Sequence, residues 1–340
     1  MVHDPVPARP GPGQVLLQIE RFVLTSNNLT YARNGGELGY WAPFPSPEAG
    51  WGRVPAWGAA RVVDGDPELP GSGELLVGFV PMATHIVVEA TPLPAGLRAT
   101  APDRSGMYPL YRDMNRPEGT LDDVALAVGP GVTPSAAHLH DELGTSAPAQ
   151  VVFSSATSRT ALTTAVLLRR AGSRVVGLTA SERVDVAVRA GVFDQVLPYT
   201  EVAEIPNLPG TAYVDVAGRP EITDAVHRTL GSALARSIRV GGTHASVATP
   251  ASSPPPGPSV ERFNVGLRRT RIADSLGARE LERLEREARE PVATWAAEHL
   301  AVERTIGLEQ ARELWHRIQH GTADPLTAHI VVPAEQPPTS

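Results

Sequence analysis

The sequence predicts an α/β protein with a β-rich N-terminal domain followed by a doubly wound parallel sheet. Residues 13–89 contain short runs of branched apolar residues separated by Pro and Gly, which is typical of strands and turns. From residue 150 onward, strand-like and helix-like segments alternate, as in βαβ units on a parallel sheet. The length of 340 residues is enough for about two domains.

The N-terminal half contains three predicted strands and one long predicted helix. Val15–Val23 is rich in branched residues, and the shorter apolar runs begin at Arg61 and His85. A segment rich in Pro, Gly and Arg follows these strands. Apolar residues at helical spacing then predict a helix over Leu121–Leu143.

The next segments predict the parallel sheet. Val151–Phe153 is a short buried strand, Ala161–Arg170 is an apolar helix, and Arg174–Thr179 is the second strand. Ser181 is the expected N-cap of the following helix. Further strands are predicted at Gln195–Leu197, Ala212–Val216 and Ser237–Gly241.

The C-terminal part begins with the Pro-rich stretch Ser252–Ser259, which predicts an exposed loop. Leu276–Glu290 carries Arg and Glu at helical spacing and is expected to be a solvated helix. A last helix is predicted at Leu308–Gln319 and a last strand at His329–Val332.

Composition excludes several kinds of chemistry. The chain has no Cys and no Lys, so all 30 basic residues are Arg. It therefore has no thiolate nucleophile, thiolate-bound zinc, lysine Schiff base or phosphate-loop lysine. The net charge of −7 argues against nucleic acid and anionic membranes as partners. Because no signal peptide or long apolar segment is evident, we expect a cytoplasmic protein.

A polar turn follows the first strand of the predicted parallel sheet. In such sheets this turn and the next helix N-terminus can bind a diphosphate, and glycine normally allows its close approach. Here the turn has no glycine. Its candidate diphosphate-binding residues are Ser154, Ser155, Thr157, Ser158, Arg159 and Thr160. The alternative is a polar turn with a serine N-cap and no ligand.

A second candidate site lies at the end of the following strand. An acidic residue there would bind the ribose hydroxyls of NAD, but this sequence has Thr179, followed by Ser181 and Arg183. Hydroxyl and guanidinium groups suit a 2′-phosphate, which favours NADPH over NADH. The alternative is a helix cap beside an exposed arginine.

Several motifs together resemble the medium-chain dehydrogenase/reductase superfamily. They are Val15–Glu20, Thr25–Gly35, Trp51–Gly58, Ser154–Ala161, Arg174–Arg183 and Val214–Gly218. The nearest well-understood relatives are the zinc-free quinone oxidoreductase and enoyl reductase branch. An offshoot known chiefly as a domain of unknown function is closer still, in Asn27–Ala32, Trp51–Gly58, Ser154–Ala161 and Val214–Gly218. The resemblance implies a GroES-like substrate domain at 1–120 and a Rossmann-type nucleotide-binding domain at 121–265. It also implies that 266–340 returns to the first domain.

The same resemblance implies roles for individual residues. Asn27 corresponds to an asparagine near nicotinamide and substrate, and Tyr40 to a tyrosine proton donor of some enoyl reductases. Gly218, Thr243 and His244 lie in turns that flank the nicotinamide and its ribose, although His244 could instead cap a surface turn. The phosphate-turn glycines of the superfamily map onto Ser155, Ser158 and Ala161, which is the main departure from its pattern.

Two other clusters are candidates for chemistry. Tyr108–Asp113 combines phenols, including Tyr111, with a guanidinium and a carboxylate that could hold a substrate carbonyl; the alternative is a linker packed by its aromatic rings. His138–Glu142 looks like a metal motif, but positions i and i+2 of a helix do not share a face. We therefore expect no metal site.

These observations predict an NADPH-dependent, zinc-independent reductase of an activated C=C or C=O bond. The expected partner is a small molecule bound between the domains, such as a carbonyl compound or thioester, and relatives suggest a homodimer. The alternatives are an enzyme of the same fold without hydride transfer (a lyase, hydrolase or isomerase) and a non-catalytic binding protein. The Arg-rich, Lys-free composition is typical of GC-rich bacterial genomes, for which specialised metabolism is one possible role.

Overall fold

The computed structural model describes residues 9–36, 39–46, 48, 50–241 and 257–333. The chain forms two compact units: unit 1 comprises 1–130 and 301–340, and unit 2 comprises 131–300. Residues 121–130 thus pack with unit 1 and residues 266–300 with unit 2, whereas the expected boundaries were at 120 and 265. No helix in these described ranges is both long and apolar enough to cross a membrane.

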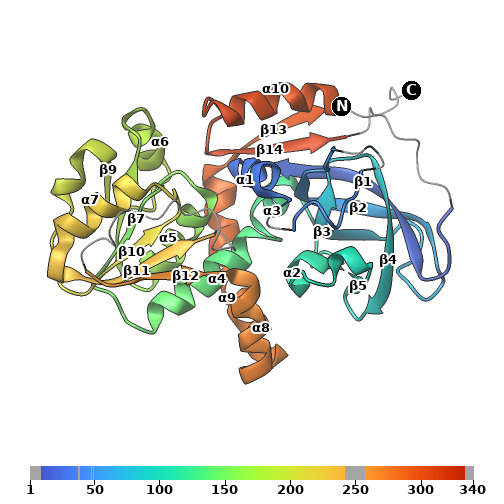
Figure 1. Ribbon diagram of the computed structural model, residues 1–340, viewed down its shortest axis with the longest axis horizontal. Helices are drawn as coiled ribbons and strands as arrows, with labels where there is room; N and C mark the ends of the chain where they lie inside the picture. Colours follow the sequence, from blue (N-terminus) through green and yellow to red (C-terminus); the bar gives the residue numbers. More distant parts are fainter. Residues whose placement is uncertain (1–8, 37–38, 47, 49, 242–256, 334–340) are drawn as a thin grey trace. The chain divides into compact units, whose positions relative to one another are not determined.

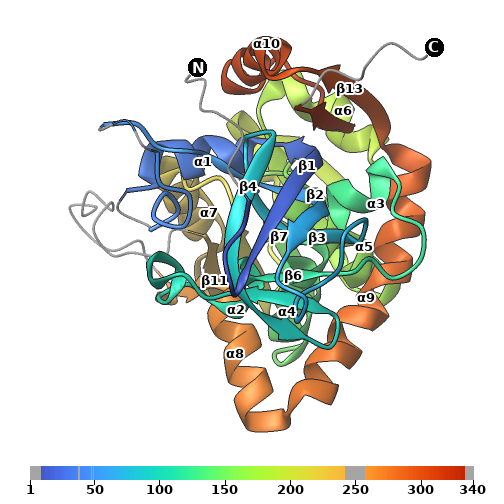
Figure 2. The same ribbon diagram turned by 90° about the vertical axis from the view of Figure 1, so that its right-hand side faces the viewer.

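Unit 1 is built around an eight-stranded sheet with the order β13-β14-β1-β2-β3-β6-β5-β4. The strand β1 also pairs with β4, so the sheet closes on itself (Figure 2). All described pairings are antiparallel except that between β13 and β14. The strands are β1 (Gln14–Leu24), β2 (Pro55–Gly65), β3 (Leu75–Pro81), β4 (His85–Leu93), β5 (Gly96–Ala99), β6 (Asp113–Asn115), β13 (Ala301–Ile306) and β14 (Thr327–Val332).

The helices of unit 1 are short except for α10. They are α1 (Ser26–Asn34), α2 (Pro109–Arg112), α3 (Asp123–Val128) and α10 (Leu308–Gln319), with a 3-10 turn η1 at Pro102–Arg104. The helix predicted over Leu121–Leu143 is in fact two helices, because Gly129–Gly131 separates α3 from α4. Asp122 caps the start of α3 by accepting from the Ala125 N–H at 2.7 Å, and at its end the Gly129 N–H donates to the Ala125 carbonyl.

Unit 2 contains a six-stranded parallel sheet with the order β12-β11-β10-β7-β8-β9. The chain runs from β7 to β9 in one direction across the sheet, and from β10 to β12 in the other. The order therefore reverses between β7 and β10, where doubly wound sheets bind their ligands. The strands are β7 (Gln150–Phe153), β8 (Arg174–Thr179), β9 (Gln195–Pro198), β10 (Thr211–Asp215), β11 (Leu234–Val240) and β12 (Val260–Phe263).

Helices cover both faces of this sheet. Figure 1 shows α7 on one side of the sheet and α4 with α9 on the other. The helix α5 packs on β8 and against both α4 and α9, while α7 packs on β10 and against η3. The helices are α4 (Val132–Gly144), α5 (Arg159–Arg170), α6 (Val184–Arg189), α7 (Pro220–Leu230), α8 (Val265–Leu276) and α9 (Ala278–His299). The 3-10 segments are η2 (Ser181–Arg183), η3 (Tyr199–Glu204) and η4 (Gly231–Ala233).

Gly177 on β8 allows the turn after β7 to pack closely on the sheet. A Cβ atom at this position would lie 2.7 Å from the Ala156 Cβ and 3.0 Å from the Phe193 ring. Ala156 is fully buried, and its N–H donates to the Leu178 carbonyl at 2.8 Å. A glycine at position 177 thus leaves room for Ala156 of the turn against β8.

We expect Gly177→Ala to lower the free energy of unfolding by about 1–3 kcal/mol, because the added methyl group overpacks this contact. Denaturant unfolding followed by circular dichroism measures the change. The control is Gly144→Ala, since a Cβ at Gly144 meets no atom within 4 Å. Equal free energies of unfolding of the two variants would contradict a close contact between Gly177 and the turn after β7.

Candidate functional site

Ser154 occupies the topological switch point of unit 2, directly after β7. Its side chain is fully buried, and its hydroxyl donates to the Asp215 carboxylate at 2.8 Å. The same oxygen accepts the N–H groups of Val216 and Ala217, each at 2.9 Å. Its carbonyl accepts from the Tyr199 hydroxyl at 2.7 Å. The Ser154 hydroxyl therefore faces β10 and holds the loop that follows it.

Asp215, the last residue of β10, organises the other side of the switch point. It is 2% exposed, and its Oδ1 accepts from the Gly218 N–H at 2.9 Å. Its Oδ2 lies 3.3 Å from the Arg239 Nε. Gly218 has a φ of +66°, a left-handed conformation that favours glycine. Sequence reasoning had not selected Asp215; the signal was a carboxylate at the end of a buried apolar strand.

The turn between β7 and α5 does not need glycine for its backbone conformation. Within the described residues, Ala147 is the only non-glycine residue with positive φ. The Ser158 hydroxyl caps α5 by accepting from the Ala161 N–H at 3.2 Å, and it donates to the Ser155 carbonyl at 3.0 Å. Serine therefore closes this turn through its side chain. The turn residues that remain half-buried are Ser155, Thr157, Ser158, Arg159 and Thr160.

The second predicted site lies after β8. Thr179 ends that strand and is buried, whereas Ser181 is exposed and Arg183 is half-buried. Ser181 does not cap a helix as expected, because it begins the 3-10 turn η2, and α6 starts at Val184 without a side-chain cap. This short turn nevertheless keeps Ser181 and Arg183 together at the strand end.

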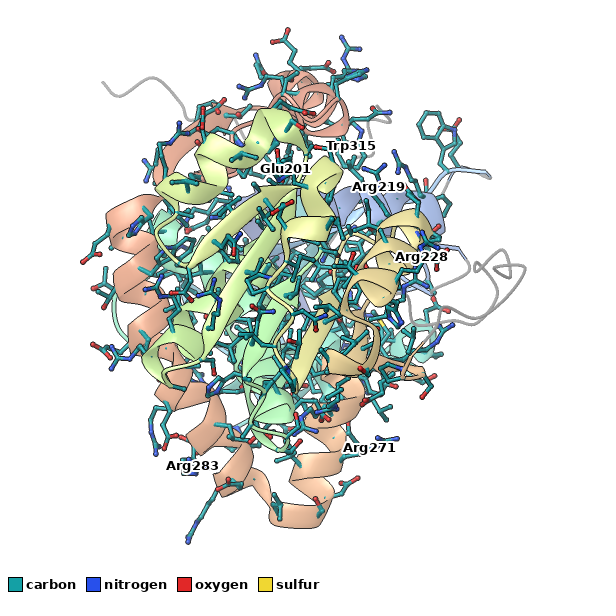
Figure 3. All side chains as sticks on the ribbon, turned by 90° about the vertical axis from the view of Figure 1, so that its left-hand side faces the viewer. Glu201, Arg219, Arg228, Arg271, Arg283 and Trp315 are labelled. Carbon is teal, nitrogen blue, oxygen red and sulfur yellow. The ribbon has the colours of Figure 1, made fainter. Side chains whose placement is uncertain are left out.

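Arginines gather at the carboxyl edge of the parallel sheet. Arg159 follows β7, Arg183 follows β8 and Arg219 follows β10, while Arg239 lies near the end of β11. The Arg219 guanidinium lies 5.2 Å from the centre of the Tyr199 ring and 2.8 Å from Glu221. Figure 3 shows Arg219 and Arg228 near opposite ends of α7. This edge thus combines cations, hydroxyls and a helix N-terminus, a set of groups that suits a phosphorylated ligand.

Unit 1 contains a cluster of aromatic side chains, which we call the aromatic cluster: Tyr31, Tyr40, Phe44, Trp57, Phe79 and Tyr111. The Tyr40 ring centre lies 4.6 Å from that of Tyr31 and 5.9 Å from that of Tyr111. Tyr40, Trp57 and Tyr111 are partly buried against the barrel core. Part of the cluster is therefore exposed to solvent.

The hydroxyls of this cluster are held by polar neighbours. Asn27 donates from Nδ2 to the Tyr31 hydroxyl at 2.7 Å. Asn27 can do so because α1 starts with a capping box between Thr25 and Asn28. Burial, followed by the neighbouring phenols Tyr40 and Tyr31, raises the pKa of Tyr111 well above its usual value. The Tyr111 phenol thus stays protonated throughout the neutral range.

The structure therefore brings together Asn27, Tyr40 and Tyr111 of the predicted catalytic residues. Sequence reasoning missed Tyr31, whose hydroxyl links Asn27 to the cluster, although its i+4 spacing from Asn27 on a helix was a usable signal. Thr243 and His244 lie outside the described residues.

A family model described as "Protein of unknown function (DUF2855)" matches residues 22–324. The chain belongs to this family. No curated protein matches the sequence.

Solved structures similar to the chain include several reductases. Quinone oxidoreductase from Escherichia coli, complexed with NADPH, has a TM-score of 0.63 and 14% identity, with 97% of this chain and 95% of that chain covered. CurA from Vibrio vulnificus, in complex with NADPH, has a TM-score of 0.62 and 16% identity, covering 99% and 94%. The quinone oxidoreductase from Coxiella burnetii has a TM-score of 0.63 and 14% identity, covering 97% and 93%. They confirm the predicted fold, a β-rich domain with a doubly wound parallel sheet.

The two remaining clusters have structural partners. Asp113 accepts two hydrogen bonds from Arg98, at 2.6 and 2.7 Å, while the Arg112 Nε donates to the Ala99 carbonyl at 3.1 Å. His138 is fully buried, with its Nε2 3.0 Å from the Glu285 carboxylate. Among the described residues, no group of three or more His, Asp or Glu side chains could hold a metal ion.

Proposed function

We propose that this family member is an NADPH-dependent, zinc-independent reductase of an activated C=C or C=O bond in a small molecule. The observation that carries the proposal is the carboxyl edge of β7, β8 and β10, where arginines and hydroxyls surround the capped N-terminus of α5. Two of the similar structures contain NADPH, which supports the same assignment. The absence of Cys from the sequence supports the zinc-independent part.

The residues at this edge fit NADPH. The half-buried turn residues Ser155, Thr157, Ser158, Arg159 and Thr160 would hold the diphosphate, together with the α5 N-terminus. Thr179, Ser181 and Arg183 would hold the adenosine 2′-phosphate, because guanidinium and hydroxyl donors match its oxygens. Ser154 and Gly218 shape the adjoining loop through Asp215. When bound, NADPH supplies a hydride.

The aromatic cluster of unit 1 supplies the groups that act on the substrate. We assign the Tyr40 hydroxyl as the group that donates a hydrogen bond, and then its proton, to the substrate carbonyl oxygen, because that oxygen develops negative charge on reduction. Tyr111, kept protonated by its raised pKa, stabilises the charge on the Tyr40 oxygen. Asn27 positions the Tyr31 hydroxyl, and the surrounding rings exclude water from the reacting bond.

We expect NADPH to bind the purified full chain and to raise its stability. A ligand at 100 times its Kd stabilises a protein by about 2.7 kcal/mol, which thermal unfolding detects readily. Thr157→Glu should abolish the stabilisation, because a carboxylate in the half-buried turn repels the diphosphate. The control is Ser275→Glu on the exposed surface of α8.

Isothermal titration calorimetry with NADPH and NADH tests the proposal directly. Binding of NADPH together with oxidation of NADPH by an enone or quinone, followed at its absorbance band, would support it. Absence of heat and of stabilisation with both nucleotides would contradict it and would favour an enzyme of this fold without hydride transfer, or a binding protein.

A further inference from the structure

Arg104 of unit 1 is a buried arginine. It lies at the end of the η1 turn and is only 3% exposed. The face of its guanidinium lies 4.7 Å from the centre of the Phe44 ring, and its Nη2 donates to the Pro43 carbonyl at 3.2 Å. Neither contact provides a negative charge.

No carboxylate within the described residues pairs with Arg104. A guanidinium has five N–H donors, and within the described ranges the Pro43 backbone carbonyl is the one hydrogen-bond acceptor of the Arg104 side chain. Burial, followed by repulsion from Arg112, lowers the pKa of Arg104 to about 10. The group is still cationic at neutral pH, and burying an unpaired charge is costly. A cation held in this way, with donors to spare, suits an anion that comes from outside the chain.

Arg104 adjoins the aromatic cluster. Phe44, on which the guanidinium lies, is itself 6.1 Å from Phe79 between ring centres. The Phe79 ring in turn lies 5.2 Å from Tyr111 and 5.1 Å from Trp57. The buried rings of Phe44 and Phe79, each 1% exposed, thus connect Arg104 to the partly exposed Trp57 and Tyr111.

We propose that Arg104 binds a carboxylate of the ligand whose conjugated, planar part contacts the aromatic cluster. The charged oxygens would accept from the guanidinium side by side, the geometry in which arginine binds carboxylates most strongly. In combination with the proposed function, on which this step rests, the substrate class is a conjugated carbonyl compound that carries a carboxylate.

The test compares trans-cinnamate with trans-cinnamamide, which has the same shape but no charge, by calorimetry on the full chain. We expect the wild-type protein to bind cinnamate at least about tenfold more tightly, the effect of one charged hydrogen-bonded pair. Arg104→Met should reduce the ratio of the cinnamamide Kd to the cinnamate Kd to about one. Methionine keeps the packing on Phe44, and Arg104→Lys, which keeps the charge, should leave an intermediate ratio.

Arg312→Met on the exposed face of α10 is the matched control and should leave the ratio unchanged. Circular dichroism of each variant verifies folding. Equal affinities for the two probes in the wild-type protein, no binding of either, or an unchanged ratio in Arg104→Met would each overturn the proposal.

NADPH titration of the same samples separates this inference from the proposed function. If NADPH binds but the carboxylate preference is absent, the anion site fails and the reductase assignment stands. If the preference is present but NADPH does not bind, Arg104 remains an anion-binding residue of a protein with another function.

Discussion

Asp215→Ala is expected to lower the free energy of unfolding by about 2–4 kcal/mol, because it leaves buried donors without an acceptor. The carboxylate accepts from the Ser154 hydroxyl and the Gly218 N–H, and both contacts are buried or partly buried. The ion pair with Arg239 contributes a smaller share, since that arginine is 29% exposed. Chemical denaturation measures the loss.

Asp215→Asn separates the two contributions. The amide can keep an oxygen at the Oδ1 position, where it still accepts from Ser154 and Gly218, so we expect less than half of the loss seen with alanine. Glu221→Ala is the control, because this glutamate forms an exposed ion pair with Arg219 and should have no measurable effect. A loss with Asp215→Ala no larger than with Glu221→Ala would exclude a central role for the carboxylate.

Arg183→Ala is expected to raise the Kd for NADPH by about 10- to 100-fold and to leave the Kd for NADH nearly unchanged. The difference arises because only NADPH has a 2′-phosphate, and a charged hydrogen-bonded pair contributes about 1.5–3 kcal/mol. Arg183 lies at the end of β8, where the second strand of such a sheet meets the adenosine ribose. Calorimetric titration with both nucleotides measures the two constants.

Arg228→Ala is the matched control for Arg183. This arginine is exposed near the C-terminal end of α7, whereas Arg219 lies at the other end of the helix, beside the carboxyl end of β10 (Figure 3). It should affect neither nucleotide. Equal losses of NADPH and NADH affinity in Arg183→Ala would instead assign this arginine to the diphosphate or to the stability of η2.

The fold was predictable because each unit has a characteristic periodicity. The predicted helix Leu308–Gln319 has the bounds of α10, and the predicted strand Arg174–Thr179 has those of β8. Apolar periodicity fixes such elements locally, whereas strand order depends on pairings between distant residues. The reversal of the strand order between β7 and β10 could therefore be expected only from the resemblance to a known superfamily.

The functional contacts were harder to predict, because they depend on which side chains meet in space. The serines and threonines after β7 indicate a polar turn but not that Ser154 would face inward to Asp215. Arg104 resembles any other arginine of an Arg-rich sequence, and only its burial on Phe44 distinguishes it. The packing role of Gly177 likewise depends on its closeness to Ala156, which is distant in sequence.

Unit 1 consists of two segments of the chain, separated by unit 2, and this affects the order in which the units can fold during synthesis. β14 pairs with β1 through residues 22–24 and 329–331, which are separated by nearly the whole chain. All of unit 2 leaves the ribosome before β14 does, so its local βαβ contacts can form while the barrel of unit 1 is still incomplete. During that interval residues 22–24 of β1 lack their β14 partner, although β2 and β4 already pair with the rest of the strand, and unpaired strand edges promote aggregation. β14 therefore both joins β13 to the barrel and covers the remaining part of the β1 edge.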